Sequence, residues 1–246
     1  VCDYLDFVIV AGREKDFFTV LLDALPLKGI TGLDLRALRP ESAVLTHLVA
    51  VAGERGYEVI SRQEDVSLEL DLPATWEGYL AALTRKQRHE VRRKLRVLAE
   101  EGEVAYRTIA DSAAIYNTMD NFLHLFATSR DDKANFMTAT MESFFRSMGA
   151  VMAGMGLLRF GLLELDRHLV AMVMYFDYHN SIYLYNSGYD PQYRSLSVGL
   201  LSKVLCIRDS ISRGKQKFDF LKGGEAYKYH LGGKEIPLYR CQVKIR

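Results

Sequence analysis

Three apolar runs near the middle of the chain constrain its fold most strongly. They cover 157–165, 169–177 and 181–187, and only three residues separate each run from the next. Apolar runs of this length with turn-forming residues between them are typical of consecutive antiparallel strands. The sequence therefore predicts an antiparallel meander in this part of the chain.

The last of these strands leads into a stretch that indicates anion binding. After Tyr189 a turn contains Pro191 and Arg194, and the first turn of the following helix contains Gly199. Unpaired N–H groups at the start of a helix, together with the positive end of its dipole, bind phosphate groups. An ordinary connection between a strand and a helix has the same pattern, so the residues alone leave both interpretations open.

Segments on both sides of the meander alternate between strand and helix patterns. The N-terminal elements are predicted as strands at 4–10, 32–38, 57–60 and 66–72, helices at 14–25 and 42–55, and one long helix at 75–101. A strand, two helices, the meander, a helix and two further strands are predicted after Gly102. We expect a partial N-terminal half-unit at 1–72, a linking helix at 73–103 and a C-terminal domain at 104–246.

The predicted linking helix concentrates positive charge. Between Arg85 and Arg96, seven basic residues accompany one acidic residue, Glu90, so the segment carries +6 in a chain of net charge +1. An anion-binding surface, a nucleic-acid surface and a solvated helix face are the three interpretations. A solvated face usually mixes charges of both signs, which favours anion binding. The expected contacts are Lys86, Arg88, Arg92 and Arg93.

Residues 189–199, YDPQYRSLSVG, resemble the acyl-CoA loop of the GNAT acyltransferase superfamily. The order of predicted elements over 104–246 is similar to the same superfamily, and 1–72 resemble the tail of a degenerate first unit. The resemblance implies an α/β (α+β) GNAT fold in tandem arrangement, with helices flanking a central mixed, mostly antiparallel sheet. It also implies acetyl-CoA or another acyl-CoA as co-substrate, without a metal, bound by Arg194, Ser195, Leu196, Ser197, Val198 and Gly199. Ser195 and Ser197 depart from the family pattern, in which glycine is common at these positions.

More narrowly, the chain is similar to the CelD-like (cellulose biosynthesis) acetyltransferases and, more distantly, to the Fem peptidoglycan aminoacyltransferases. The matching segments are 84–94, 185–189 and 218–229. The resemblance implies acyl transfer to an amine on a small molecule, a saccharide or a peptide. A Fem-like enzyme that uses aminoacyl-tRNA on a cell-wall precursor is one alternative, and an inactive GNAT-like binding module is another.

Acyl transfer to an amine needs a proton acceptor, a stabilised oxyanion and a protonated leaving group. The candidate bases are Asp219 and Glu225, the candidate acid is Tyr227, and Asn186 is a candidate to orient the acyl carbonyl. The resemblance assigns stabilisation of the oxyanion or leaving group to Lys228, and it places Lys133 at the border of the substrate cleft. Structural roles are the alternatives: a turn cap for Asp219 or Asn186, a core position for Tyr227, and a stem packed between tyrosines for Lys228.

Composition and cysteine usage bound the class of protein. A hydrophobic share of 49% and a charged share of 26% are ordinary for a globular protein. Cys2, Cys206 and Cys241 lack the CxxC spacing of a zinc or redox site, which indicates reduced thiols. No apolar run has the length of a membrane span. These features favour a cytoplasmic protein, and the resemblance implies a bacterial enzyme. The first residue, Val1, favours a natural N-terminus further upstream.

Overall fold

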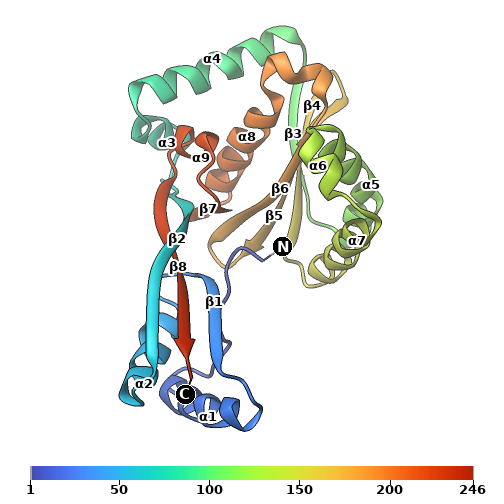
Figure 1. Ribbon diagram of the computed structural model, residues 1–246. Helices are drawn as coiled ribbons and strands as arrows, with labels where there is room; N and C mark the ends of the chain where they lie inside the picture. Colours follow the sequence, from blue (N-terminus) through green and yellow to red (C-terminus); the bar gives the residue numbers. More distant parts are fainter. Residues whose placement is uncertain (1, 246) are drawn as a thin grey trace. The chain divides into compact units, whose positions relative to one another are not determined.

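The computed structural model describes residues 2–245, which form alternating groups of helices and strands (Figure 1). In chain order the elements are α1 (Glu14–Leu27), β1 (Gly32–Leu38), the π-helix η1 (Val44–Leu48), α2 (Val49–Glu54), β2 (Glu58–Asp71), α3 (Trp76–Ala82), α4 (Arg85–Glu101), β3 (Val104–Ile109), α5 (Ser112–Thr128), α6 (Asp131–Phe136), α7 (Ala139–Gly154), β4 (Leu158–Leu165), β5 (His168–Tyr178), β6 (Ser181–Tyr189), the 3-10 helix η2 (Pro191–Leu196), α8 (Val198–Ser212), β7 (Lys217–Lys222), α9 (Ala226–His230) and β8 (Lys234–Lys244).

The strands are hydrogen-bonded in the order β1-β8-β2-β7-β6-β5-β4-β3. Antiparallel pairing joins β1 to β8, β3 to β4, β4 to β5 and β5 to β6, whereas β6 and β7 are parallel. The predicted meander is confirmed, because β4, β5 and β6 are consecutive antiparallel neighbours. The predicted fold class is also confirmed: helices flank a mixed, mostly antiparallel sheet.

Contacts along the chain define two compact units, which we describe separately. The larger unit comprises Glu69–Phe220 and Ala226–Gly233. The smaller unit comprises Val1–Leu68, Leu221–Glu225 and Lys234–Arg246. The predicted division at residues 72 and 103 describes the remains of a duplicated fold as well as compact units of packing. It stays a prediction.

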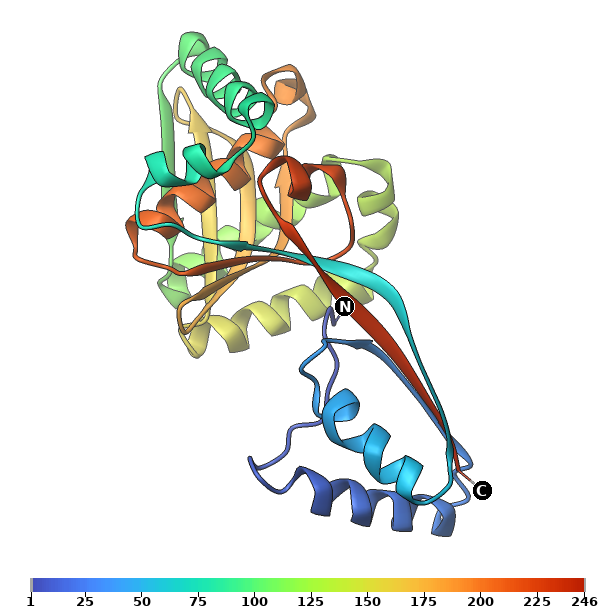
Figure 2. The same cartoon turned by 90° about the vertical axis from the view of Figure 1, so that its left-hand side faces the viewer.

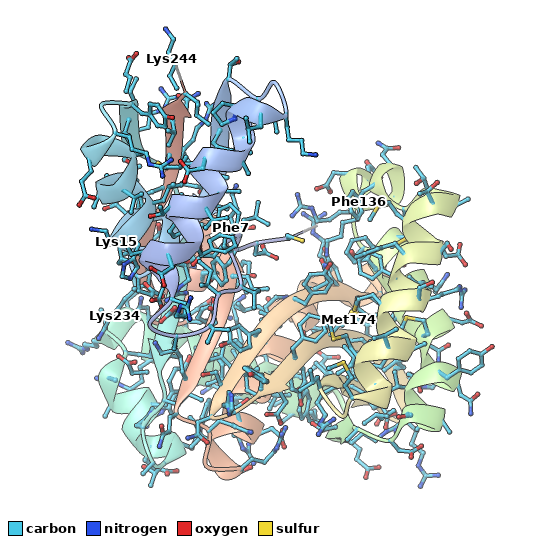
Figure 3. All side chains as sticks on the ribbon, turned by 90° about the horizontal axis from the view of Figure 1, so that it is seen from below. Phe7, Lys15, Phe136, Met174, Lys234 and Lys244 are labelled. Atoms are coloured by element: carbon cyan, nitrogen blue, oxygen red, sulfur yellow. The ribbon has the colours of Figure 1, made fainter. Side chains whose placement is uncertain are left out.

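In the larger unit, helices cover both faces of the strands β3 to β6 (Figure 1). On one face lie α5 and α7, and on the other lies α8. Phe122 of α5, Phe145 of α7 and Met174 of β5 belong to one buried cluster, and Met174 is labelled in Figure 3. Each fully buried side chain of this size contributes about 1.5–3 kcal/mol through loss of its contact with water. The cluster therefore fixes α5 and α7 against the meander.

In the smaller unit, α1 and α2 lie beside the strands β1, β8 and β2 (Figure 2). Phe18 and Leu22 recur at helical spacing on α1 and are fully buried against Leu48 and Cys241 in the same cluster. This apolar face is what the spacing of the 14–25 segment predicts.

The strand predicted at 4–10 is wrong. This segment is extended, but it joins no ladder of the sheet. Phe7 packs against the rings of Phe17 and Phe18 of α1 (Figure 3), whereas Val8 and Val10 are exposed. An apolar run of strand length predicts burial, but here Phe7 and Ile9 pack against the core while the Leu5 N–H and the Asp6 carboxylate make single hydrogen bonds to Ala37 and Ala43.

The two strands predicted at 57–60 and 66–72 form one continuous strand, β2. The residues between them include no glycine or proline, so nothing in the sequence forces a turn there. Glu64, in the middle of β2, accepts a hydrogen bond from the N–H of Ala37 (2.6 Å). Ala37 has a positive φ of 51° at an irregularity of β1, and the Glu64 carboxylate satisfies its amide.

The single helix predicted at 75–101 is two helices, α3 and α4. Thr84 starts α4 with a capping box: its hydroxyl accepts from the Gln87 N–H, and the Gln87 side chain accepts from the Thr84 N–H. This Thr-x-x-Gln pattern is a known start signal for a helix. It lies within the apolar spacing from which a single helix was predicted. A further short helix, α6, lies between the two helices predicted after Gly102.

Within residues 2–245, no helix is both long enough and apolar enough to cross a membrane.

Candidate active site

Strand β6 is irregular next to Asn186. Asn186 pairs with Met174 and Leu184 pairs with Tyr175, so Tyr185 is an extra residue on β6. A bulge of this kind increases the local twist and redirects the neighbouring groups. Asn186, the predicted carbonyl-orienting residue, therefore lies where the regular ladder is interrupted.

The edge of β6 opens beyond this bulge. Parallel pairing with β7 covers three residue pairs and ends at Tyr183 and Asp219. On the β5 side, the Asp190 N–H donates to the Val170 carbonyl (2.9 Å), so these two residues form a hydrogen-bonded pair. Hydrogen-bonded and non-hydrogen-bonded pairs alternate along an antiparallel ladder, which makes Ser187 a member of a non-hydrogen-bonded pair. The N–H and C=O of Ser187 consequently point away from β5, towards the edge that β7 has left. This edge is a place where an extended ligand can meet backbone donors and acceptors.

Lys133 of α6 reaches this edge. Its Nζ donates to the Ser187 carbonyl (2.5 Å) and lies 4.7 Å from the centre of the Phe126 ring. Burial lowers the pKa of Lys133 to about 8, and the nearby Arg130 acts in the same direction while Asp132 opposes it. The structure thus brings Lys133 next to Asn186, although the sequence separates them by more than fifty residues.

The start of α8 has an unusual backbone. Ser197, the residue before the helix, has φ 58° and ψ 31°, in the left-handed region that favours glycine. Ser197 therefore adopts the conformation that glycine adopts easily, while Ser195 has no positive φ. The first N–H groups of α8, those of Val198 and Gly199, precede the intrahelical hydrogen bonds that begin at Leu200.

Lys94 adds a positive charge at this helix start. Its Nζ donates to the hydroxyl of Ser197 (2.6 Å) and lies 3.4 Å from the Glu90 carboxylate. Arg194 and Ser195 of η2 are exposed, and Leu196 is half-buried. Among the described residues, the Arg194 guanidinium makes no hydrogen bond or ion pair. The helix start, Lys94 and Arg194 together can bind an anionic group.

Gly199 is needed for packing within the protein. A Cβ at this position would lie 2.8 Å from the Tyr189 ring, at the end of β6. The glycine therefore allows α8 to start directly against the strand that precedes it, which keeps the edge of β6 and the start of α8 close together.

The basic residues of α4 divide into two groups. Arg88 donates to the carbonyls of Leu80 and Ala81 at the end of α3, and Arg93 forms a fork with Glu90 (2.9 and 3.0 Å). The hydrogen bond from Arg93 lowers the pKa of Glu90 to about 2. These contacts assign Arg88 and Arg93 partners within the protein.

The second group faces solvent. Arg85, Lys86 and Arg92 are exposed, and in the part of the chain that the structure describes their side chains form no ion pair. They line an open hollow of about 890 Å³ together with Arg88, His89 and Glu90. Of the four predicted anion contacts, Lys86 and Arg92 are thus the ones placed to meet a ligand.

Several ionisable side chains are buried around α9. Lys228 is 2% exposed, Asp219 of β7 is 1% exposed, and Lys203 of α8 is 8% exposed. The Lys203 Nζ donates to the Gly199 carbonyl (2.7 Å) and lies 5.1 Å from the centre of the half-buried Tyr227 ring. Burial of charged groups is costly unless they are paired, so a protein retains them where they have a function or a specific partner.

Glu225 lies in the short segment that directly precedes α9. It is exposed, belongs to the smaller unit, and folds back over Gly223, where a Cβ would lie 2.7 Å from Oε2 of Glu225. Within residues 2–245, no group of three or more His, Cys, Asp or Glu side chains is arranged to hold a metal ion.

The sequence interpretation missed Lys94 and Lys203. Lys94 was one of seven basic residues on a helix, and nothing in the sequence distinguished the one that meets Ser197. Lys203 lies between Leu201 and Val204 on an apolar helix, and a lysine on a buried helical face is a signal that could have identified it.

Comparison with known proteins agrees with this geometry. A family model described as an acetyltransferase (GNAT) domain matches residues 85–229. No curated protein matches the chain.

Three solved structures share the fold at low identity. FemX is 10% identical with a TM-score of 0.65, covering 96% of this chain and 79% of its own. A conserved protein of unknown function from Bacteroides thetaiotaomicron is 14% identical with a TM-score of 0.64, covering 94% and 75%. L-PGS from Bacillus licheniformis is 11% identical with a TM-score of 0.57, covering 93% and 72%. At these identities the likeness concerns the fold alone.

Proposed function

This chain belongs to the GNAT acetyltransferase family, and we propose that it transfers an acyl group from acyl-CoA directly to an amine. Acetyl-CoA is the first donor to test. The observation that carries the proposal is the arrangement of β6 and α8. The open strand edge at Ser187 and a helix start flanked by Lys94 are joined by a single short connection.

The helix start suits the pyrophosphate of the donor. We assign this group to the N–H groups of Val198 and Gly199, with Lys94 and Arg194 adding charge-assisted contacts. Ser195, Ser197 and Leu196 complete the loop around it. The pantetheine arm would then follow the open edge of β6, where the Ser187 N–H points.

The transfer step is assigned to groups on β6, β7 and α9. Backbone N–H groups at the β6 edge and Lys228 would stabilise the developing oxyanion, with Asn186 orienting the acyl carbonyl. Tyr227 would protonate the leaving thiolate, and Asp219 is the first choice of base because it is buried, with the exposed Glu225 as the second. Attack by the acceptor amine needs no covalent acyl-enzyme.

The acceptor side is assigned to α4 and α6. Lys86 and Arg92 are exposed and form no ion pair with any residue that the structure describes, which favours an acceptor that carries an anionic group as well as an amine. The same acceptor-binding region would include Arg88, Arg93 and Lys133. Within the family, the segments 84–94, 185–189 and 218–229 favour the CelD-like branch.

Calorimetric titration of the chain with acetyl-CoA and desulfo-CoA tests the donor. We expect a micromolar Kd that weakens by about tenfold in Arg194→Ala and in Lys94→Ala, because each loses one charge-assisted contact. Arg62→Ala and Lys28→Ala remove exposed charges in the smaller unit and serve as matched controls. No binding by a folded sample would refute the assignment of CoA.

An aminoacyltransferase that uses charged tRNA is the second candidate. Two observations favour it: the exposed basic residues of α4 and the fold that the chain shares with FemX. This donor would be supported if a sample that does not bind acetyl-CoA binds tRNA with a Kd that rises steeply with salt concentration.

A further inference from the structure

Lys133 is assigned to the acceptor side of the proposed site, and its amine also reaches the strand edge that is assigned to the donor. Its Nζ donates to the carbonyl of Ser187, one residue beyond Asn186, on the edge of β6 that β7 has left. From α5, the Phe126 ring covers the amine at 4.7 Å. The amine is therefore held at the strand edge by a carbonyl and a ring, and neither of these groups titrates.

Burial makes the neutral, nucleophilic form of this amine more populated than that of an exposed lysine, while the ammonium form still predominates at neutral pH. Burial lowers its pKa to about 8, and Arg130 adds to this effect. Asp132 opposes the shift, but its carboxylate is held in a fork by the Arg130 guanidinium (2.9 and 3.0 Å). An exposed lysine has a pKa near 10.4, so at neutral pH the neutral fraction of Lys133 exceeds that of an exposed lysine by roughly a hundredfold.

The same strand edge is where the proposed function places the acyl donor. A thioester lying along β6 at Ser187 would bring its carbonyl carbon near the amine that already contacts the Ser187 carbonyl. The inference rests on that donor assignment.

We propose that Lys133 is a site of self-acylation when no acceptor amine is present. The neutral Nζ attacks the thioester carbonyl, a C–N bond forms, and the C–S bond breaks. The amine gives up one proton, and the leaving thiolate takes up one proton as it departs as free CoA thiol. The product is an amide, which is far less reactive than a thioester, so it is a dead end for transfer and compatible with direct attack. Acylation also removes the positive charge beside Phe126, which would weaken the attachment of α6 to β6.

Intact mass spectrometry of the full chain incubated with acetyl-CoA alone tests this inference. We expect the gain of one acetyl group, mapped to Lys133 by peptide analysis, at a rate independent of protein concentration because the reaction occurs within the complex. The rate at Lys133 should exceed that at the exposed Lys28 by more than about tenfold. Lys133→Arg should abolish the single addition, and Lys28→Arg should leave it unchanged.

Separate readouts distinguish failure of this inference from failure of the donor assignment. If acetyl-CoA binds and amines are acetylated while Lys133 stays unmodified, or is modified no faster than Lys28, the inference is overturned and the donor assignment stands. If acetyl-CoA does not bind, the donor assignment fails and self-acylation from CoA fails with it. A small acylating reagent, the N-hydroxysuccinimide ester of acetic acid, then measures the amine alone: labelling of Lys133 no faster than Lys28 would also overturn its assigned reactivity.

Discussion

The two compact units differ in what they bury. In the smaller unit, the described buried residues are apolar side chains, Cys241 and the uncharged Ser42 and Ser67. In the larger unit, the buried residues also include Glu69, Lys203, Asp219 and Lys228, and Lys217 pairs with Glu69 at 2.6 Å. A buried charge costs free energy unless it is paired, so burial of these groups depends on specific partners in a way that burial of a leucine does not. This difference supports the proposed placement of the chemistry in the larger unit.

Removing a buried charge should give the largest effect. We expect Lys228→Met to lower kcat for amine acetylation by about a hundredfold, because it removes a group assigned to the oxyanion while keeping most of the side-chain volume. Lys28→Met, in the smaller unit, should leave kcat unchanged. Steady-state kinetics with titration of acetyl-CoA would check this result. Equal kcat values in a folded Lys228→Met sample would mean that the buried lysine is structural.

Glycine substitutions should separate the two units by the sign of their effect. A Cβ at Gly188 would lie 2.3 Å from the Phe126 amide nitrogen on α5, so Gly188→Ala should destabilise the larger unit by about 1–3 kcal/mol. Gly53, within α2, has open space around it and no positive φ, so Gly53→Ala should stabilise the smaller unit by up to about 1 kcal/mol. Chemical denaturation of both variants measures the difference. Destabilisation by both changes to the same extent would contradict the packing argument.

The start of α8 offers a smaller, more specific test. Ser197→Gly relieves the left-handed backbone but removes the acceptor of the Lys94 hydrogen bond, while Ser197→Ala removes the acceptor and keeps the unfavourable backbone. The glycine variant should therefore be more stable than the alanine variant by about 1 kcal/mol. Equal midpoints of denaturation would show that the backbone at Ser197 relaxes without cost.

Cysteine labelling compares how the two units open. Burial raises the pKa of Cys206 to about 12 and also raises that of Cys241, so in the native protein a thiolate-specific reagent should modify the exposed Cys2 first. At moderate denaturant we expect Cys241 to react before Cys206, because a smaller core opens at lower free energy. Mass spectrometry of quenched samples reads the order. Simultaneous labelling would mean that the two units unfold as one.

Local patterns in the sequence predicted the meander and the helix after Tyr189, because each depends on periodicity and turn residues nearby. The fold class came from the resemblance of residues 189–199 and of the order of elements to the GNAT superfamily. The errors came from tertiary context. Phe7 anchors a segment that has no strand partner, and the capping box at Thr84 divides what apolar spacing joined into one helix. For the candidate site, the sequence predicted the start of α8 and the end of β6, which stay predictions, but not the contact of Lys94 with Ser197 or of Lys133 with Ser187. Those contacts join positions 103 and 54 residues apart, and no local pattern encodes them.

The route of the chain around α9 limits how this protein can be divided. Leu221–Glu225 before α9 and Lys234–Arg246 after it belong to the smaller unit, whereas α9, with Lys228, belongs to the larger. A fragment ending at Tyr229, where the family match ends, would lose β8, the strand between β1 and β2. A fragment ending before α9 would lose Lys228 itself. Neither unit can therefore be cut out as one continuous segment. Recombination between relatives through a single crossover would have to transfer both units together or neither.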